Sequence, residues 1–235
     1  MIKRSISLAI ILTLVMASFG NYKNTEAKTG GQLLTGILSK MQTAHRGLRS
    51  MRTSITQQRH NPQIGGTDTD YGTLIYKPGG KGNSRLRIDY TKPDQKSVSV
   101  IGESLVFYQP RINQVFKSTL SKAAKGKTGS YAGLIGLDSS LESLTREYNV
   151  EYVKDALVNG KETSLLSLTP KGGSPFSKVE LWVSNEFWLP VQYQMHERNG
   201  DSTLVKFTGM EVNPSINETA FKISYPSSAK LVDKL

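Results

Sequence analysis

Few residues in this chain stand at spacings that support catalysis or metal binding. The three histidines, His45, His60 and His196, fall in different parts of the sequence and share no metal-ligand spacing, so a Ser–His–Asp triad also has weak support. The chain has no cysteine, which excludes thiol nucleophiles, zinc knuckles, iron–sulfur ligands and a lipobox thiol that would carry an acyl chain. We therefore predict no metal site, no cofactor and no enzyme activity.

Two short motifs resemble ligand-binding sequences without completing them. Residues 121–128 end in Gly-Lys-Thr like a phosphate-binding loop, but Ser121 stands where the first glycine must make the tight turn. Asp68 and Asp70 follow two glycines, but they lack the further oxygen ligands and the distal glutamate of a calcium-binding loop. We predict a loop without nucleotide for the first motif and a hairpin loop for the second.

The chain is basic, with 30 Lys and Arg against 19 Asp and Glu and a formal net charge of +11. Arg85 and Arg87 lie near aromatic residues, but the charge is dispersed and no nucleic-acid motif is present, so we predict no nucleic-acid partner. The densest basic stretch has two interpretations, a mobile solvated loop or transient contact with a membrane surface or membrane partner. Its lysines are Lys117, Lys122, Lys125 and Lys127.

The first residues predict an export signal. Two basic residues precede an apolar run of fourteen residues, 6–19, which is shorter than the roughly 20 residues that span a bilayer. Small residues allow cleavage after Gly20 or after Ala27, and we favour Ala27. The sequence thus predicts a signal peptide at residues 1–27 and a single exported domain at residues 28–235.

Hydrophobic periodicity indicates the elements that build this domain. Apolar residues recur every three or four positions over residues 32–51 and again at Leu134, Leu137, Leu141 and Leu144, as on one face of an amphipathic helix. Elsewhere the period is two, and turn signals separate about eleven short strands. The strands are predicted at residues 71–77, 85–90, 97–100, 104–109, 113–119, 149–154, 162–169, 178–184, 189–197, 203–210 and 220–225.

Many antiparallel strands without alternating βαβ units favour a strongly curved sheet. The predicted fold class is mainly β with helices (α+β): an incomplete antiparallel β-barrel of about eleven strands, covered on its concave side by the two amphipathic helices.

Short motifs along the strands follow one another in an order typical of one family. They lie at residues 72–78, 85–94, 98–102, 105–110 and 113–115, and in the second half at 168–170, 176–183, 189–193 and 220–226. In this order the chain resembles the outer-membrane lipoprotein carrier family, LolA. It resembles a divergent member, because its hairpin has Ile101-Gly102 and Val106 where the family has Asp-Gly and Trp.

The resemblance implies an apolar cavity inside the incomplete barrel, closed by helices that act as a lid. The residues assigned to the lid are Leu134, Leu137 and Leu141, with Leu33, Ile37 and Met41 as its helical neighbour. Proteobacterial members usually have Arg before the proline of the first motif, linked to lid closure. Lys77 stands there and keeps the charge without the planar donor fork, so only part of the lid-locking role would transfer.

The resemblance and the strand alternation together assign a wall that binds acyl chains. Each member is an apolar or aromatic residue on the predicted concave side of a strand. They are Leu74, Tyr76, Leu86, Ile88, Tyr90, Val98, Val100, Val106, Tyr108, Val191, Tyr193 and Met195.

The resemblance implies that the protein transports lipoproteins across the periplasm. A monomer would accept the acyl chains of a lipoprotein from an inner-membrane release complex and pass them to an outer-membrane acceptor. Two other functions stay open, periplasmic binding or sensing of another lipid and hydrolysis of acyl esters by a secreted enzyme.

Overall fold

The computed structural model describes residues 30–79, 83–125 and 141–232. The predicted signal peptide, the lid residues Leu134 and Leu137, and Lys127 of the basic stretch lie outside the described residues. Within the described part, no helix is long and apolar enough to cross a bilayer.

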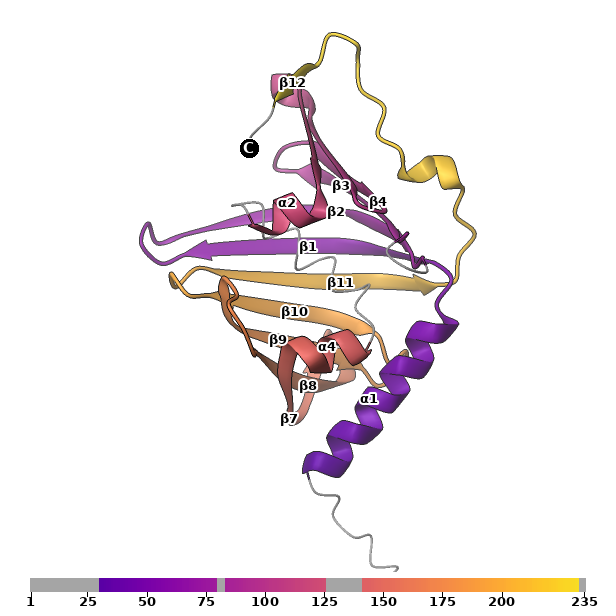
Figure 1. Cartoon of the computed structure of the whole chain (residues 1–235), viewed down its shortest axis with the longest axis vertical. Helices are drawn as coiled ribbons and strands as arrows, with labels where there is room; N and C mark the ends of the chain where they lie inside the picture. Colours follow the sequence, from indigo (N-terminus) through magenta and orange to yellow (C-terminus); the bar gives the residue numbers. More distant parts are fainter. Residues whose placement is uncertain (1–29, 80–82, 126–140, 233–235) are drawn as a thin grey trace, which may run out of the picture.

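One twelve-stranded sheet forms the body of the molecule (Figure 1). Its strand order is β12-β6-β5-β4-β3-β2-β1-β11-β10-β9-β8-β7, and every neighbouring pair is antiparallel except the parallel pair β12 and β6. Since β12 and β7 end the order as edges, the sheet is open, which confirms the predicted incomplete barrel.

The strands divide into two arms on either side of the central β1–β11 pair (Figure 1). The first arm is described together with the central strand β1. Its strands are β1 (Met51–Asn61), β2 (Gly66–Lys77), β3 (Arg85–Lys92), β4 (Lys96–Ile101), β5 (Ser104–Gln109), β6 (Gln114–Thr119) and β12 (Lys230–Val232). The second arm is described together with the central strand β11. Its strands are β7 (Tyr148–Val158), β8 (Lys161–Pro170), β9 (Phe176–Ser184), β10 (Pro190–Glu197) and β11 (Ser202–Val212).

One long and two short α-helices of the described residues lie against this sheet (Figure 1). The helix α1 (Gly30–Gly47) and the helix α4 (Leu141–Glu147) contact β7 and each other, whereas α2 (Leu120–Lys125) contacts β6 at the end of the other arm. Two 3-10 turns, η2 (Pro110–Ile112) and η4 (Glu218–Phe221), complete the described helical segments.

The structure corrects the predicted first helix. The helix ends at Gly47, where the side chain of Asn213 donates to the carbonyl of Gly47 at 3.1 Å. Met51, predicted as helical, begins β1. This strand escaped prediction because its inward positions alternate Met51, Thr53, Ile55 and Gln57, of which only two are apolar.

Three further segments differ from their predicted structure. Asp68 and Asp70 lie inside β2 and not in a loop, because the hairpin turns earlier, before Gly66. The predicted strand at residues 220–225 is partly the turn η4, and the last strand forms later, at Lys230–Val232. Lys122 and Lys125, which were predicted in a loop, belong to the helix α2, where backbone hydrogen bonds hold the segment in a helical conformation.

Strand register defines an inner face of the sheet. In the first arm Leu74, Ile88, Val98 and Phe107 follow one another across paired strands, and each is buried. In the second arm Leu166, Leu181, Tyr193, Val205 and Gln57 form a continuing row into β1. We call the side of the sheet that carries these rows the inner face.

A C-terminal strap, residues 213–229, crosses the opposite, outer face from β11 to β12 (Figure 1). Arg85, Arg87 and Asp89 point away from the inner face, and Arg87 donates to the strap carbonyls of Ala220 at 3.0 Å and Lys222 at 2.8 Å. The hydroxyl of Ser99 donates to the carbonyl of Phe221 at 2.6 Å. The strap thereby links the middle of the sheet to its β12 edge.

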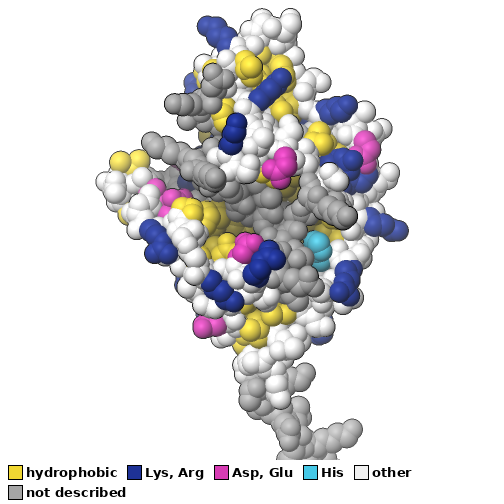
Figure 2. Space-filling model, viewed as in Figure 1, with side chains coloured by type: hydrophobic (Ala, Val, Ile, Leu, Met, Phe, Trp, Pro, Cys, Tyr) yellow, Lys and Arg dark blue, Asp and Glu magenta, His cyan; other side chains and the backbone are white. Residues whose placement is uncertain are grey.

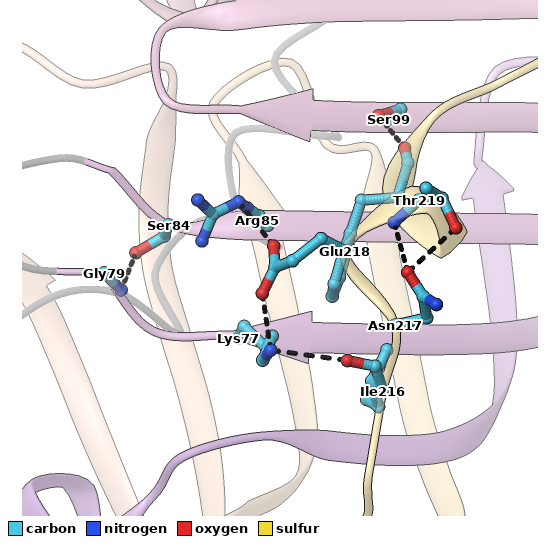
Figure 3. Close-up of polar contacts among 10 residues, drawn as sticks. Lys77, Gly79, Ser84, Arg85, Ser99, Ile216, Asn217, Glu218 and Thr219 are labelled. Carbon is cyan, nitrogen blue, oxygen red and sulfur yellow. Dashed lines mark hydrogen bonds and ion pairs between the residues drawn. The ribbon is translucent and has the colours of Figure 1, made fainter.

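Glu218 is the main charged anchor of the strap (Figure 3). Its carboxylate accepts from Lys77 Nζ at 2.6 Å and pairs with Arg85 Nε at 3.1 Å. The hydrogen bond from Lys77, with smaller contributions from the two positive charges, lowers the pKa of Glu218 below its ordinary value.

Acid is therefore expected to loosen the strap. A carboxylate with a depressed folded-state pKa adds stability above its unfolded pKa, and this contribution is lost as the pH falls through the folded value. We expect the urea midpoint to drop more for the unmodified protein than for Glu218→Gln between about pH 6 and about pH 3. Equal drops in both proteins would show that Glu218 contributes nothing to this pH dependence.

Candidate functional site

The inner face carries two adjoining apolar clusters. The larger one joins buried side chains of both arms, from Leu86, Ile88 and Phe107 to Met195 and Phe207. The smaller one packs buried Leu166, Leu168 and Val183 against Ile37 of α1 and Leu144 of α4. Figure 2 shows hydrophobic side chains on either side of the centre of the face that carries α2 and α4, with many of the lysines and arginines around them.

Most of the residues predicted for the acyl-binding wall lie together on the inner face. Nine of them are buried members of the larger cluster: Leu74, Tyr76, Leu86, Ile88, Tyr90, Val98, Val100, Tyr193 and Met195. The structure thus brings together side chains from β2, β3, β4 and β10, and their shared role in binding stays a prediction.

The other three predicted wall residues lie elsewhere or between faces. Val106 pairs with Ser99, on the outer face, and Tyr108 packs its ring 5.8 Å from that of Tyr225 in the strap. Both are displaced because β5 is in a register one residue from the one expected, which exchanges its two faces. Leu105 and Phe107 take the inner positions, at 1% and 6% exposure. Val191 is half-buried beside an irregularity of β10.

Two of the predicted lid residues, Ile37 and Met41, pack against the second arm. Ile37 is buried and Met41 half-buried in the smaller cluster, whereas Leu33 is half-buried without belonging to it. Leu141 begins α4, and its side chain is not among those described. Lys40 of α1 lies over the ring of Trp188, with 4.0 Å between Nζ and the ring centroid, which adds a cation–π contact to this packing.

Lys77 does not face these helices. It follows the inward-facing Tyr76, so strand alternation turns it to the outer face, where it binds Glu218 and the carbonyl of Ile216 (Figure 3). The position assigned to lid locking therefore holds the strap.

A polar group interrupts the apolar inner face at the centre of the sheet. Gln57 is fully buried, and its Oε1 accepts the hydroxyl of Tyr90 at 2.5 Å. Beside it, the buried carboxylate of Asp70 pairs with Arg59 at 2.8 Å and with Lys96 at 2.7 Å. We call Gln57, Asp70, Tyr90, Lys96 and Arg59, together with Tyr193, the central polar cluster.

Gly72 lets Tyr90 approach β1. A Cβ at Gly72 would collide with the carbonyl oxygen of Asp89 and stand 2.8 Å from the Cα of Tyr90, so any side chain would push β3 away. The pairing of β2 with β3 also shifts register next to this glycine. The sequence signal for the cluster was weak, because polar residues on a strand ordinarily indicate a solvent-facing side.

Tyr193 completes the central polar cluster from β10. Its ring lies 5.9 Å from that of Phe207, and burial, together with the nearby phenol of Tyr90, raises the pKa of Tyr193 well above its ordinary value. The hydroxyl of Tyr193 is buried and has no hydrogen-bond partner among the described residues.

The two tyrosines are expected to respond oppositely to loss of the hydroxyl. Tyr90→Phe leaves Gln57 Oε1 buried without its donor, so we expect the free energy of unfolding to fall by about 1–3 kcal/mol. Tyr193→Phe removes an unpartnered hydroxyl, so we expect no loss and a gain of up to about 1 kcal/mol. Urea unfolding of both variants tests this, and a marked loss for Tyr193→Phe would indicate a hydrogen bond at its hydroxyl.

Histidine and carboxylate side chains do not gather into a metal site in the described part of the chain, where no group of three or more His, Asp or Glu side chains could hold a metal ion. His196 of β10 pairs with Glu180 of β9 at 2.8 Å on the outer face. His60 contacts Thr67 at 3.2 Å in the first hairpin.

Comparison with known proteins identifies the family. The family model described as "Outer membrane lipoprotein carrier protein LolA" matches residues 46–224. The chain belongs to this family. Among curated LolA-family relatives, the outer-membrane lipoprotein carrier protein of Cupriavidus taiwanensis is 27% identical over 197 residues, which cover 82% of this chain and 86% of that protein. The carrier of Neisseria meningitidis serogroup B is 26% identical over 170 residues, 71% of this chain and 73% of that protein.

The chain is also similar to proteins that are not named as lipoprotein carriers. An uncharacterized protein of Methanocaldococcus jannaschii is 22% identical over 197 residues, and the match spans 83% of this chain but only 52% of the archaeal protein. An uncharacterized conserved protein of Thermus thermophilus has the same fold, with a TM-score of 0.56 at 12% identity over 86% of this chain and all of that one. The protein MucB gives a TM-score of 0.53 at 14% identity, over 81% of this chain and 62% of its own.

Proposed function

We propose that this protein is a periplasmic carrier that binds the acyl chains of lipoproteins and transfers them toward the outer membrane. The observation that carries the proposal is the inner face, an apolar surface that runs through both arms of an open sheet in a chain of the LolA family. The names of the bacterial relatives support the choice of cargo.

The chemistry of the cargo fits this face. An acyl chain gains roughly 0.8 kcal/mol for each buried CH₂, so a chain of about fifteen methylenes gains on the order of 10 kcal/mol when fully covered. The side chains of the inner face are mostly aliphatic and aromatic, apart from the central polar cluster and buried Thr53. Binding needs no covalent step, and direction would follow from the relative affinities of donor, carrier and acceptor.

Access to the inner face requires the covering helices to move. We propose that α1 is one such cover, because Ile37 and Met41 pack directly on the β8 and β9 side chains of the smaller cluster. The acyl-binding wall then consists of the nine buried residues named above together with Leu105 and Phe107. A signal peptide at residues 1–27 would deliver a single carrier domain, residues 28–235, to the periplasm.

Extraction of the purified protein with organic solvent, followed by lipid mass spectrometry, tests the proposal. Co-purifying lipopeptides, or saturable binding of a synthetic lipopeptide with three palmitoyl chains, are expected. The same peptide without acyl chains is the matched control and should not bind. Free lipids alone would favour binding or sensing of another lipid, turnover of an acyl ester would favour a hydrolase, and absence of any acyl binding would overturn the carrier.

A further inference from the structure

Two buried polar atoms of the central polar cluster have no partner in the described part of the chain. They are the amide nitrogen of Gln57, whose side chain is fully buried, and the hydroxyl of Tyr193, whose residue is 4% exposed. Burial of an unpaired donor costs free energy, and most buried polar groups in proteins are hydrogen-bonded. These two atoms therefore call for a common explanation.

The two side chains lie on the same stretch of the inner face. Gln57 pairs with Val205 of β11, and Val205 pairs with Tyr193 of β10, so the two residues are separated by one strand. Tyr90 reaches both, because it donates to Gln57 and interacts electrostatically with Tyr193. The Gln57 amide and the Tyr193 hydroxyl are thus two donors in one small region, bordered by the apolar side chains of the larger cluster.

The charges next to these donors favour a ligand oxygen that carries negative or partial negative charge. Both oxygens of Asp70 are already engaged, since one binds Arg59 and the other binds Lys96. Two cations against one anion leave an excess of positive charge beside Gln57 and Tyr90, with Lys96 Nζ 5.1 Å from the Tyr90 ring centroid. A cationic ligand would meet this excess of positive charge, whereas a carbonyl oxygen would meet the two donors and a positive field.

We propose that Gln57 and Tyr193 bind the carbonyl oxygen of an acyl ester or acyl amide. This inference rests on the proposed function, because it assigns the point on the inner face at which the head of an acyl chain is held. Tyr90 acts as a positioning residue by fixing the Gln57 side chain through Oε1. The hydrocarbon of the same chain would extend over the neighbouring apolar side chains, so the site selects acyl chains over plain alkyl chains.

A pair of ligands that differ only in the carbonyl tests the site. The fluorescent apolar probe N-phenyl-1-naphthylamine is bound first and then displaced by 1-decanoylglycerol, an ester, or by 1-O-decylglycerol, its ether analogue. We expect the ester to bind about ten-fold more tightly than the ether, as one neutral hydrogen bond in a buried site provides. In Tyr193→Phe the ester should lose about five- to ten-fold in affinity while the ether is unchanged.

Tyr71→Phe is the matched control, because Tyr71 is 49% exposed and lies outside the central polar cluster. It should keep the full preference for the ester. Equal binding of ester and ether by the unmodified protein would overturn the carbonyl site, as would equal losses for both ligands in Tyr193→Phe. Failure of both ligands and of the probe to bind would instead overturn the proposed carrier function, so the two failures are distinguishable.

Discussion

Asp70→Asn is expected to lower the free energy of unfolding by about 3 kcal/mol or more. The carboxylate is 3% exposed and pairs with both Lys96, 14% exposed, and Arg59, 33% exposed. Removal of its charge leaves two cations close together, and Lys96 has little access to water. Breaking a buried ion pair in this way costs more than the pair itself contributes, because the remaining charge stays desolvated.

Asp68→Asn is the matched control for this substitution. Asp68 lies two residues earlier on the same strand, is exposed, and should change stability by less than about 0.5 kcal/mol. Urea unfolding measures both variants, and Lys96→Met added to Asp70→Asn should restore part of the loss. A loss below about 1 kcal/mol for Asp70→Asn would mean that Lys96 and Arg59 find other solvation when the carboxylate is removed.

The part of the fold that the sequence predicted well is the part governed by regular alternation. Leu86, Ile88 and Tyr90 alternate with Arg85, Arg87 and Asp89, and the structure places the first set inward and the second outward. In this strand hydrophobic burial alone decides the orientation. β5 shows the opposite case, since both of its faces carry apolar or aromatic residues, Leu105 and Phe107 on one and Val106 and Tyr108 on the other, so composition did not determine which face is buried.

The central polar cluster was not predicted because its members become neighbours only through the sheet. Gln57 lies in a strand that the hydrophobic pattern does not reveal, and Asp70 was assigned to a loop. Tyr90 and Tyr193 were expected on the wall as aromatic surface, without a polar role. Their proximity depends on the pairing of β1 with β11 and β2, and on the missing side chain of Gly72, none of which local sequence encodes.

The strap also depends on contacts between distant residues. The predicted strand at 220–225 has an apolar alternation, but the backbone there bonds to side chains, Ser99 and Arg87, and not to a neighbouring strand. Phe221, an apolar residue of this alternation, is nevertheless fully buried. The strap therefore buries an apolar side chain without forming a strand.

Phe221→Ala is expected to lower the free energy of unfolding by about 3–5 kcal/mol. The ring is fully buried where η4 packs on β3 and β4, so its removal leaves a cavity that the polar anchors of the strap hold open. Ile64→Ala is the control, because Ile64 is 81% exposed in the first hairpin and should change stability by less than about 0.5 kcal/mol.

Phe221→Ala also tests whether the strap maintains the shape of the sheet. If the strap holds the curvature of the first arm, Phe221→Ala should increase amide hydrogen exchange in β3 and β4 as well as in the strap itself, and should weaken binding of an acylated ligand at the inner face. Increased exchange confined to residues 213–229, with a stability loss below about 1 kcal/mol, would show instead that the sheet keeps its shape without the strap. The first result would link an outer-face contact to acyl binding on the inner face, because β3 and β4 supply Ile88, Tyr90 and Val98 to the proposed wall.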